Sequence, residues 1–152
     1  MDNPTMRAFA APRVRVDAMA TLEALPFMSE TIEQYLVSGL GLSSDTPEPM
    51  LLRLAIQEAV TNVIRHSYAG RDPGWVELEL TCDDGEIVAV VRDQGIPFNP
   101  TSDEYEMPDP AQLIEAGRGI GIIRQVMGRI EYRYDPELGN ELTPGRAATP
   151  AG

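Results

Sequence analysis

Apolar residues recur along the chain at two spacings, and each spacing predicts one kind of secondary structure. A spacing of three to four residues is typical of an amphipathic helix, and it occurs over residues 25–38 and from residue 47 to residue 66 or 68. Strict alternation is typical of a strand with one buried face, and it occurs in RVRVDA, WVELELTC, EIVAVVRD and RIEYRY. The order of these segments predicts a small α+β domain in which helices pack against a sheet.

Turn and loop signals separate the predicted elements. DDG, residues 83–85, predicts a hairpin between WVELELTC and EIVAVVRD, and RVRVDA is expected at an edge of the sheet. Residues 94–110 are polar and carry four prolines, so a surface loop is expected there. A short helix near residues 110–116 and a further helix after GRGIGI are expected to follow.

Both ends of the chain are expected to be irregular. Residues 1–12 predict a loose arm. Pro144 has no N–H to donate to a neighbouring strand, so the last strand is expected to break after Thr143 and residues 144–152 to form a disordered tail. With no repeat and no linker in between, residues 1–152 are expected to form a single domain.

The composition is that of an acidic globular protein. The 152 residues are 43% hydrophobic and carry 24 acidic and 12 basic side chains, a formal net charge of −12. This charge argues against binding to nucleic acid or to an anionic membrane surface. No stretch approaches the roughly 18 to 20 apolar residues that span a bilayer, and the first residues lack the apolar run of a secretory signal. One cysteine, Cys82, excludes an internal disulfide, and a cytoplasmic location is expected.

All 12 basic residues are arginine. A chain without lysine can contain neither the P-loop motif nor the strand lysine of the eukaryotic-type kinase fold. Schiff-base and pyridoxal-phosphate chemistry are excluded for the same reason. If this protein handles ATP, it does so without a lysine on the phosphates.

The second predicted helix carries a polar stripe. Glu58, Asn62 and His66 are spaced four residues apart, and on a helical wheel they lie directly beside the apolar face. Half-buried polar groups need partners. The stripe could bond to nearby backbone at the rim of the core. It could also form the floor of a pocket, with a carboxylate as general base and an amide oxygen as a ligand for Mg²⁺.

Two other segments offer groups that bind a nucleotide. Asp93 ends an apolar strand directly before a turn that contains Gly95, where a carboxylate can accept a hydrogen bond from an exocyclic amine. AGRGIGI places Gly117, Gly119 and Gly121 just before a predicted helix. Free N–H groups at a helix N-terminus bind phosphate, and Arg118 adds a fixed positive charge.

The order of these motifs resembles the Bergerat-type ATPases, a superfamily of gyrase, chaperone, mismatch-repair and histidine-kinase ATP domains. E-x-x-x-N-x-x-x-H on a helix is followed by D-x-G-x-P-F after a strand and by G-R-G-x-G before a helix. AIQEAVTNVIRHSY, VRDQGIPFNP and GRGIGIIRQVMGRIEYRY are most similar to the anti-sigma-factor serine kinases of bacterial partner-switching systems. The resemblance extends from about Thr21 to Leu142. It implies a two-layer α/β sandwich, with a mixed, mostly antiparallel sheet and helices on one face.

The resemblance also implies roles for the residues that match its motifs. Glu58 corresponds to the general base, Asn62 to the Mg²⁺ ligand that bridges the ATP phosphates, and Asp93 to the acid that reads adenine. Gly95 permits the close turn beside Asp93. The phosphate-lid glycines correspond to Gly117, Gly119 and Gly121, and Arg118 corresponds to the arginine near the γ-phosphate.

The expected function is therefore that of an ATP- and Mg²⁺-dependent serine/threonine kinase and anti-sigma factor. Its expected substrate is a small anti-sigma-antagonist protein of the STAS type, with a sigma factor as a second partner and a homodimer as the implied assembly. Two alternatives stay open at this point: a module of the same fold that binds ATP and a partner without transferring phosphate, and a histidine-kinase catalytic domain. The latter needs a phospho-accepting histidine, and His66 lies inside the nucleotide motif.

Overall fold

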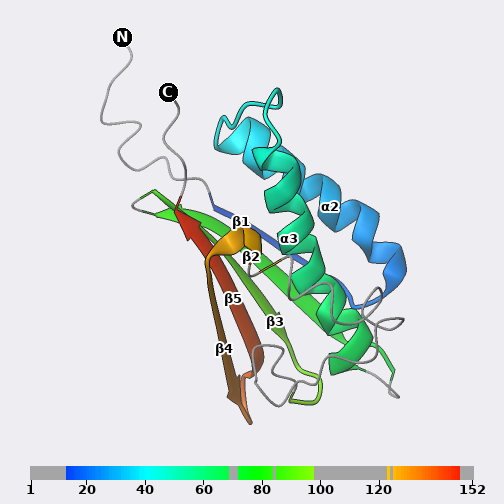
Figure 1. Ribbon diagram of the computed structural model, residues 1–152. Helices are drawn as coiled ribbons and strands as arrows, with labels where there is room; N and C mark the ends of the chain where they lie inside the picture. Colours follow the sequence, from blue (N-terminus) through cyan, green and yellow to red (C-terminus); the bar gives the residue numbers. More distant parts are fainter. Residues whose placement is uncertain (1–12, 69–71, 84, 98–122, 124, 148–152) are drawn as a thin grey trace, which may run out of the picture.

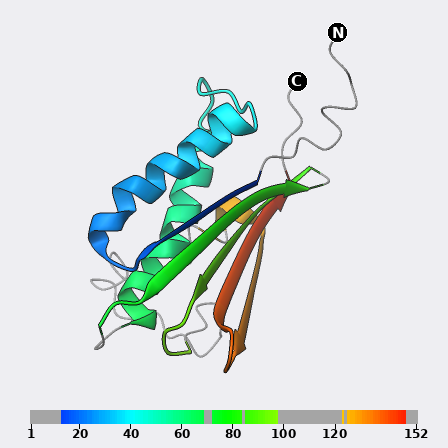
Figure 2. The same cartoon turned by 180° about the vertical axis from the view of Figure 1, so that it is seen from behind.

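The computed structural model describes residues 13–68, 72–83, 85–97, 123 and 125–147, which form two layers. Two helices lie side by side on one face of a five-stranded sheet, and the other face of the sheet is uncovered by helices in the described part of the chain (Figures 1 and 2). The helical elements are the 3₁₀ turn η1 (Leu22–Ala24), α2 (Leu25–Gln34), the π-helical turn η2 (Tyr35–Gly39), α3 (Glu48–Asn62) and the π-helical turn η3 (Val63–Ser67). The strands are β1 (Arg13–Met19), β2 (Trp75–Asp83), β3 (Glu86–Asp93), β4 (Arg129–Asp135) and β5 (Gly139–Ala147). The predicted α+β class is confirmed.

The strands follow the order β1-β2-β3-β5-β4, and all four neighbouring pairs are antiparallel. The predicted edge position of β1 and the predicted β2–β3 hairpin are both confirmed. The parallel pairing expected from a mixed sheet is not found among the described strands.

The core lies between the helices and the covered face of the sheet. Along β3, buried and partly exposed residues alternate over all eight positions, as the sequence pattern predicts. Ile32 and Leu36 from the first helical segment meet Leu52 and Ile56 of α3 in this core, and all four are fully buried. The burial of these side chains fixes which face of each helix lies on the sheet.

Both long helices end in a π-helical turn. Their predicted extents are confirmed, because η2 continues α2 to Gly39 and η3 continues α3 to Ser67. The turn η3 brings Ser67 beside the end of β3, where its carbonyl oxygen accepts a hydrogen bond of 2.8 Å from the N–H of Ile96. Single π-helical turns of this kind are frequent at functional sites.

The expectation that the last strand breaks at Pro144 is wrong. Strand β5 continues through Pro144 to Ala147 and pairs with β4 without interruption, with Ile130 opposite the proline. On the other side, the pairing with β3 skips Thr143 and Pro144 and resumes at Gly145 in the same register. The proline therefore interrupts the ladder with β3 without ending the strand, because its fixed φ is compatible with extended backbone.

Several expectations fall outside the described residues: the arm over 1–12, the loop from residue 98 onward, the helix near 110–116, and residues 148–152 of the tail. After this gap, Ile123 and residues 125–127 are helical and lead into β4. In the part of the chain that the structure describes, no helix is both long and apolar enough to cross a bilayer.

A glycine in the β4–β5 turn allows this turn to lie against the end of β3. Gly139 has φ +90°, and a Cβ placed there would lie less than 3.0 Å from the backbone oxygen of Asp93. Gly41 also has positive φ, +74°, but a Cβ there meets no atom within 4 Å. The two positions therefore share the backbone conformation and differ in the surrounding space.

We expect Gly139→Ala to destabilise the protein more than Gly41→Ala. The control substitution incurs only the left-handed backbone cost of about 1–2 kcal/mol. Gly139→Ala adds overpacking against β3, worth roughly a further 1–3 kcal/mol. Urea denaturation of both variants measures the difference, and equal losses would contradict the packing described here.

Candidate functional site

The polar stripe of α3 lies beside the core, as predicted. Asn62 is buried, with 7% of its surface exposed, while Glu58 and His66 are half-buried. Their helix neighbours Ala59 and Val63 are buried in the apolar core. Burial lowers the pKa of His66, and the nearby positive charge of Arg65 lowers it further, so the neutral imidazole is favoured at neutral pH.

The side chain of Asn62 has an unmet hydrogen-bonding group. Its amide nitrogen is buried, and it has no hydrogen-bond partner among the described residues. Burying an unpaired amide costs about 1–3 kcal/mol, which is why such groups are rare in folded proteins. A half-turn of the amide exchanges its nitrogen and oxygen, so Asn62 can present either a donor or an acceptor to a ligand.

Asp93 is a buried carboxylate held by donors from three segments. It ends β3 with 4% exposure, and its Oδ1 accepts from the N–H of Gly95 at 2.8 Å and from Nδ2 of Asn140 at 2.9 Å. Its Oδ2 accepts from the hydroxyl of Ser67 at 3.2 Å. Burial raises the pKa of Asp93 above its ordinary value, and these three hydrogen bonds act in the opposite direction.

Gly95 permits the close contact between the turn after β3 and the end of η3. A Cβ at this position would lie less than 3.0 Å from the backbone oxygen of Ser67. The same contact allows the adjacent N–H of Ile96 to reach that oxygen. Any side chain at residue 95 would push the turn away from the helix and would move the carboxylate of Asp93 with it.

Three residues of this site were missed in the sequence. Ser67 directly follows His66, the last residue of the stripe, and the π-helical turn brings it to Asp93. Asn140 is the second residue of β5, and its side-chain carbonyl oxygen accepts a hydrogen bond from the hydroxyl of Tyr132 on β4. The sequence signal for Asn140 was its residue type. Asparagine is depleted in strands, so an asparagine buried in one usually has a specific hydrogen-bonding role.

Asn62, the middle residue of the stripe, and Asp93, at the end of β3, line a small cavity between the helix layer and the sheet. Its walls are partly apolar and partly polar. The lining residues are Ala59, Asn62, Val63, Ser67, Asp93, Tyr132, Asn140 and Leu142. The free volume of this cavity is about 10 Å³, room for one water molecule at most, so a flat heterocycle that bonds to Asp93 would need the walls to move apart.

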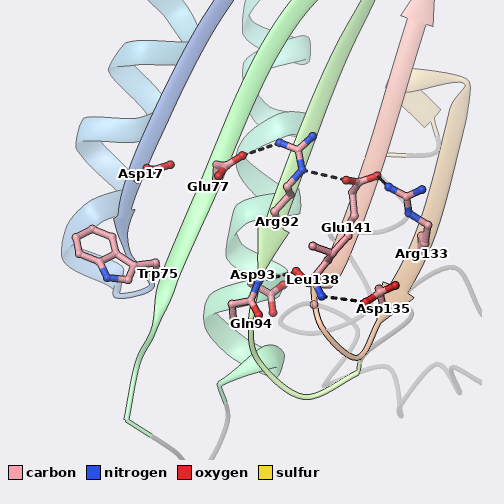
Figure 3. A pocket seen from close by; sticks show the side chains of 11 residues that line it. Asp17, Trp75, Glu77, Arg92, Asp93, Gln94, Arg133, Asp135, Leu138 and Glu141 are labelled. Atoms are coloured by element: carbon pink, nitrogen blue, oxygen red, sulfur yellow. Dashed lines mark hydrogen bonds and ion pairs between the residues drawn. The ribbon is translucent and has the colours of Figure 1, made fainter.

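A second hollow, of about 330 Å³, lies on the open face of the sheet (Figure 3). Arg92 lies at its centre and bonds to Glu77 at 2.6 Å and to Glu141 at 2.9 Å, while Arg133 bonds to Glu141 at 2.8 Å. These charges come from adjacent strands and satisfy one another. Because these side chains are already paired, they have fewer hydrogen-bonding positions left for a ligand than the unpaired amide of Asn62 has.

Glu79 belongs to the same charged face. Burial alone would raise its pKa, but hydrogen bonds from Arg13 and Arg92 outweigh burial and hold the pKa below the ordinary value. A depressed carboxylate pKa contributes stability that is present above the unfolded-state pKa and is lost as the pH falls through the folded-state pKa. This network therefore stabilises the sheet at neutral pH.

The remaining predicted site residues, Gly117, Arg118, Gly119 and Gly121, lie outside the described residues. In the described part of the chain, no group of three or more His, Cys, Asp or Glu side chains could hold a metal ion. Among the predicted site residues that the structure describes, Asn62 and Asp93 line one cavity, whereas Glu58 is half-buried and does not line it.

The sequence of this chain is similar to those of bacterial kinases and anti-sigma factors. A serine-protein kinase RsbW of Listeria monocytogenes serotype 4a (strain HCC23) is 26% identical over 114 residues, which cover 71% of each chain. An anti-sigma F factor of Bacillus licheniformis is 29% identical over 94 residues, covering 60% of this chain and 64% of that protein.

A solved structure shows the same fold. The histidine kinase domain of a blue-light-activated histidine kinase from Erythrobacter litoralis EL346 superposes with a TM-score of 0.50 at 20% identity. The match covers 82% of this chain and 59% of that one. Residues 18–143, most of the sequence, match the histidine kinase-like ATPase domain. The chain belongs to the histidine kinase-like ATPase domain family.

Proposed function

We propose that this protein is an ATP-dependent serine/threonine kinase and anti-sigma regulatory factor of a bacterial partner-switching system. Its proposed substrate is a small anti-sigma-antagonist protein of the STAS type. The observation that carries the proposal is a single cavity that holds both the buried carboxylate of Asp93 and the unpaired amide of Asn62. The names of the relatives, a serine-protein kinase and an anti-sigma F factor, support the choice of substrate class.

In this proposal, Asp93 reads the adenine base. An ionised carboxylate has about four acceptor positions, and three of those on Asp93 are taken by Gly95, Asn140 and Ser67. The remaining position, on Oδ2, would accept a hydrogen bond from the exocyclic amine of adenine. The apolar side chains of the same cavity would contact the faces of the ring.

Asn62 would hold the magnesium ion through its amide oxygen. Mg²⁺ is commonly bound by one or two protein oxygens together with substrate phosphates and water, rather than by a cage of protein ligands. The described residues fit this kind of site, because they supply one uncommitted amide one helical turn from a carboxylate. The ion would neutralise charge on the phosphates and orient them for transfer.

Glu58 would act as the general base, one turn before Asn62 on α3. As the substrate hydroxyl oxygen attacks the γ-phosphorus, Glu58 accepts the hydroxyl proton, and the bond from phosphorus to the β–γ bridging oxygen breaks to release ADP. Arg118 would stabilise the charge on the transferring phosphoryl group, and Gly117, Gly119 and Gly121 would bind the phosphates through their backbone N–H groups. We further propose that the protein is cytoplasmic, that it forms a homodimer, and that a sigma factor is its second partner.

We expect Asn62→Ala to weaken Mg²⁺-dependent ATP binding by about tenfold or more, since tenfold corresponds to about 1.4 kcal/mol of binding energy. The loss should shrink when Mg²⁺ is replaced by a chelator, because the amide acts through the ion. Calorimetric titration of ATP measures both affinities. Gln34→Ala, which removes an exposed amide from α2, is the control and should bind ATP as the wild type does. If millimolar ATP gives no binding to the wild type, the nucleotide site is disproved.

We expect Glu58→Gln to abolish phosphoryl transfer while leaving the ATP affinity within about twofold. Loss of a general base costs roughly 10²–10⁴-fold in rate. The measurement is transfer of radiolabelled γ-phosphate from ATP to a purified STAS-type antagonist protein. Glu33→Gln, at an exposed position of α2, is the matched control and should transfer phosphate normally. A wild-type protein that binds both ATP and the antagonist but transfers no phosphate is a sequestering module and not a kinase.

A further inference from the structure

Asn140 is a buried polar side chain of the cavity that bonds to three other segments. It is 4% exposed, and its Nδ2 donates to Oδ1 of Asp93 at 2.9 Å and to the carbonyl oxygen of Ile96 at 2.8 Å. Its carbonyl oxygen accepts the hydroxyl of Tyr132. One amide therefore joins β5 to the end of β3, to the turn after it and to β4.

These contacts fix which way the amide points. If the side chain were reversed, its carbonyl oxygen would face the carboxylate of Asp93 and the carbonyl of Ile96, which are both acceptors. Tyr132 donates from the opposite side and so favours the observed orientation. Tyr132 lies diagonally across the β4–β5 ladder from Asn140, a spacing that a long aromatic side chain can bridge.

The orientation of Asn140 determines what Asp93 can offer a ligand. Oδ1 already accepts two hydrogen bonds, from Gly95 and from Asn140, and each carboxylate oxygen has about two acceptor positions. Oδ2 accepts one, from Ser67, and keeps one position. Asp93 can therefore receive one hydrogen bond from a base, through one oxygen.

Adenine and guanine present different hydrogen-bonding groups to a carboxylate. Adenine presents one exocyclic amine with an acceptor nitrogen beside it, and a single acceptor position is enough to bind that amine. Guanine presents a ring N–H and an exocyclic amine side by side, and a carboxylate binds this pair with both oxygens. Guanine that places O6 where adenine has its amine would set two acceptors against each other.

We infer that Asn140 is a specificity-determining residue, which selects adenine over guanine by occupying Oδ1 of Asp93. Tyr132 is a positioning residue that keeps the amide of Asn140 in place. The inference rests on the proposed nucleotide site and names the feature of that site that sets its base preference.

The test compares ATP and GTP affinities by calorimetry, so it needs no protein substrate. Asn140→Leu removes the donor to Oδ1 at similar size, and we expect the ratio of ATP to GTP affinity to fall by about tenfold or more, the size of a bidentate discrimination. Tyr132→Phe should shift the ratio in the same direction by less. Tyr134→Phe removes the hydroxyl of a residue on the same strand that is 40% exposed, and it is the matched control. An unchanged ratio in a folded Asn140→Leu protein that binds ATP overturns the inference.

Asn140→Asp tests the same contact without a change of size, in case the leucine variant does not fold. Two adjacent carboxylates cannot both ionise easily, so ATP affinity of this variant should be weak at pH 8 and should recover as the pH falls, when the shared proton supplies the missing donor. The wild type should change in the opposite sense, because burial raises the pKa of Asp93 and acid removes its charge. Parallel pH profiles for the two proteins would overturn the inference.

Other titratable groups surround Asp93, and the wild type and the variant share them. They include Arg65 and His66 of η3, Tyr68 directly after it, Arg92 of β3, Tyr132, Arg133, Tyr134 and Asp135 of β4, and Glu141 of β5. The difference between the two pH profiles therefore reports residue 140. A wild type that binds no ATP disproves the proposed function itself, whereas a wild type that binds ATP and GTP equally disproves the selectivity alone.

Discussion

The structure of the site depends on one buried carboxylate and on the donors that surround it. Asp93 joins the end of β3 to η3 through Ser67, to the following turn through Gly95, and to β5 through Asn140. An ionised carboxylate in the core is costly unless it is hydrogen-bonded. Its donors therefore determine how closely the helix layer and the sheet approach at this end, and they leave a cavity whose polar wall is already oriented.

The two faces of the sheet use polar groups in different ways. On the open face, arginine and glutamate side chains from adjacent strands pair with one another, and Arg92 alone contacts three carboxylates. On the covered face, most residues are apolar, and the amide of Asn62 has no partner among the described residues. The first arrangement stabilises the sheet, whereas the second keeps a buried group available for a ligand.

The chain contains no lysine, and the proposed nucleotide site does not need one. In that proposal the nucleotide is bound by a buried carboxylate, a helix amide, backbone N–H groups and an arginine. The family match extends over residues 18–143 and so includes the strands and helix that surround Asp93.

The sequence by itself determined the elements of this protein and the residues that are local to them. Periodicity predicted the helices, the hairpin and the polar stripe at Asn62, and the turn signal marked Asp93 and Gly95, because these features depend on neighbours within a few positions. Only the tertiary structure decided that Asn140 and Tyr132 belong to the site. Asn140 is 47 residues from its partner Asp93, and the strand order that joins them leaves no periodic signal. The tertiary structure also decided the outcome at Pro144, which was expected to end a strand. Strand β5 continues through this residue because the backbone is extended there and the pairing with β4 is unbroken.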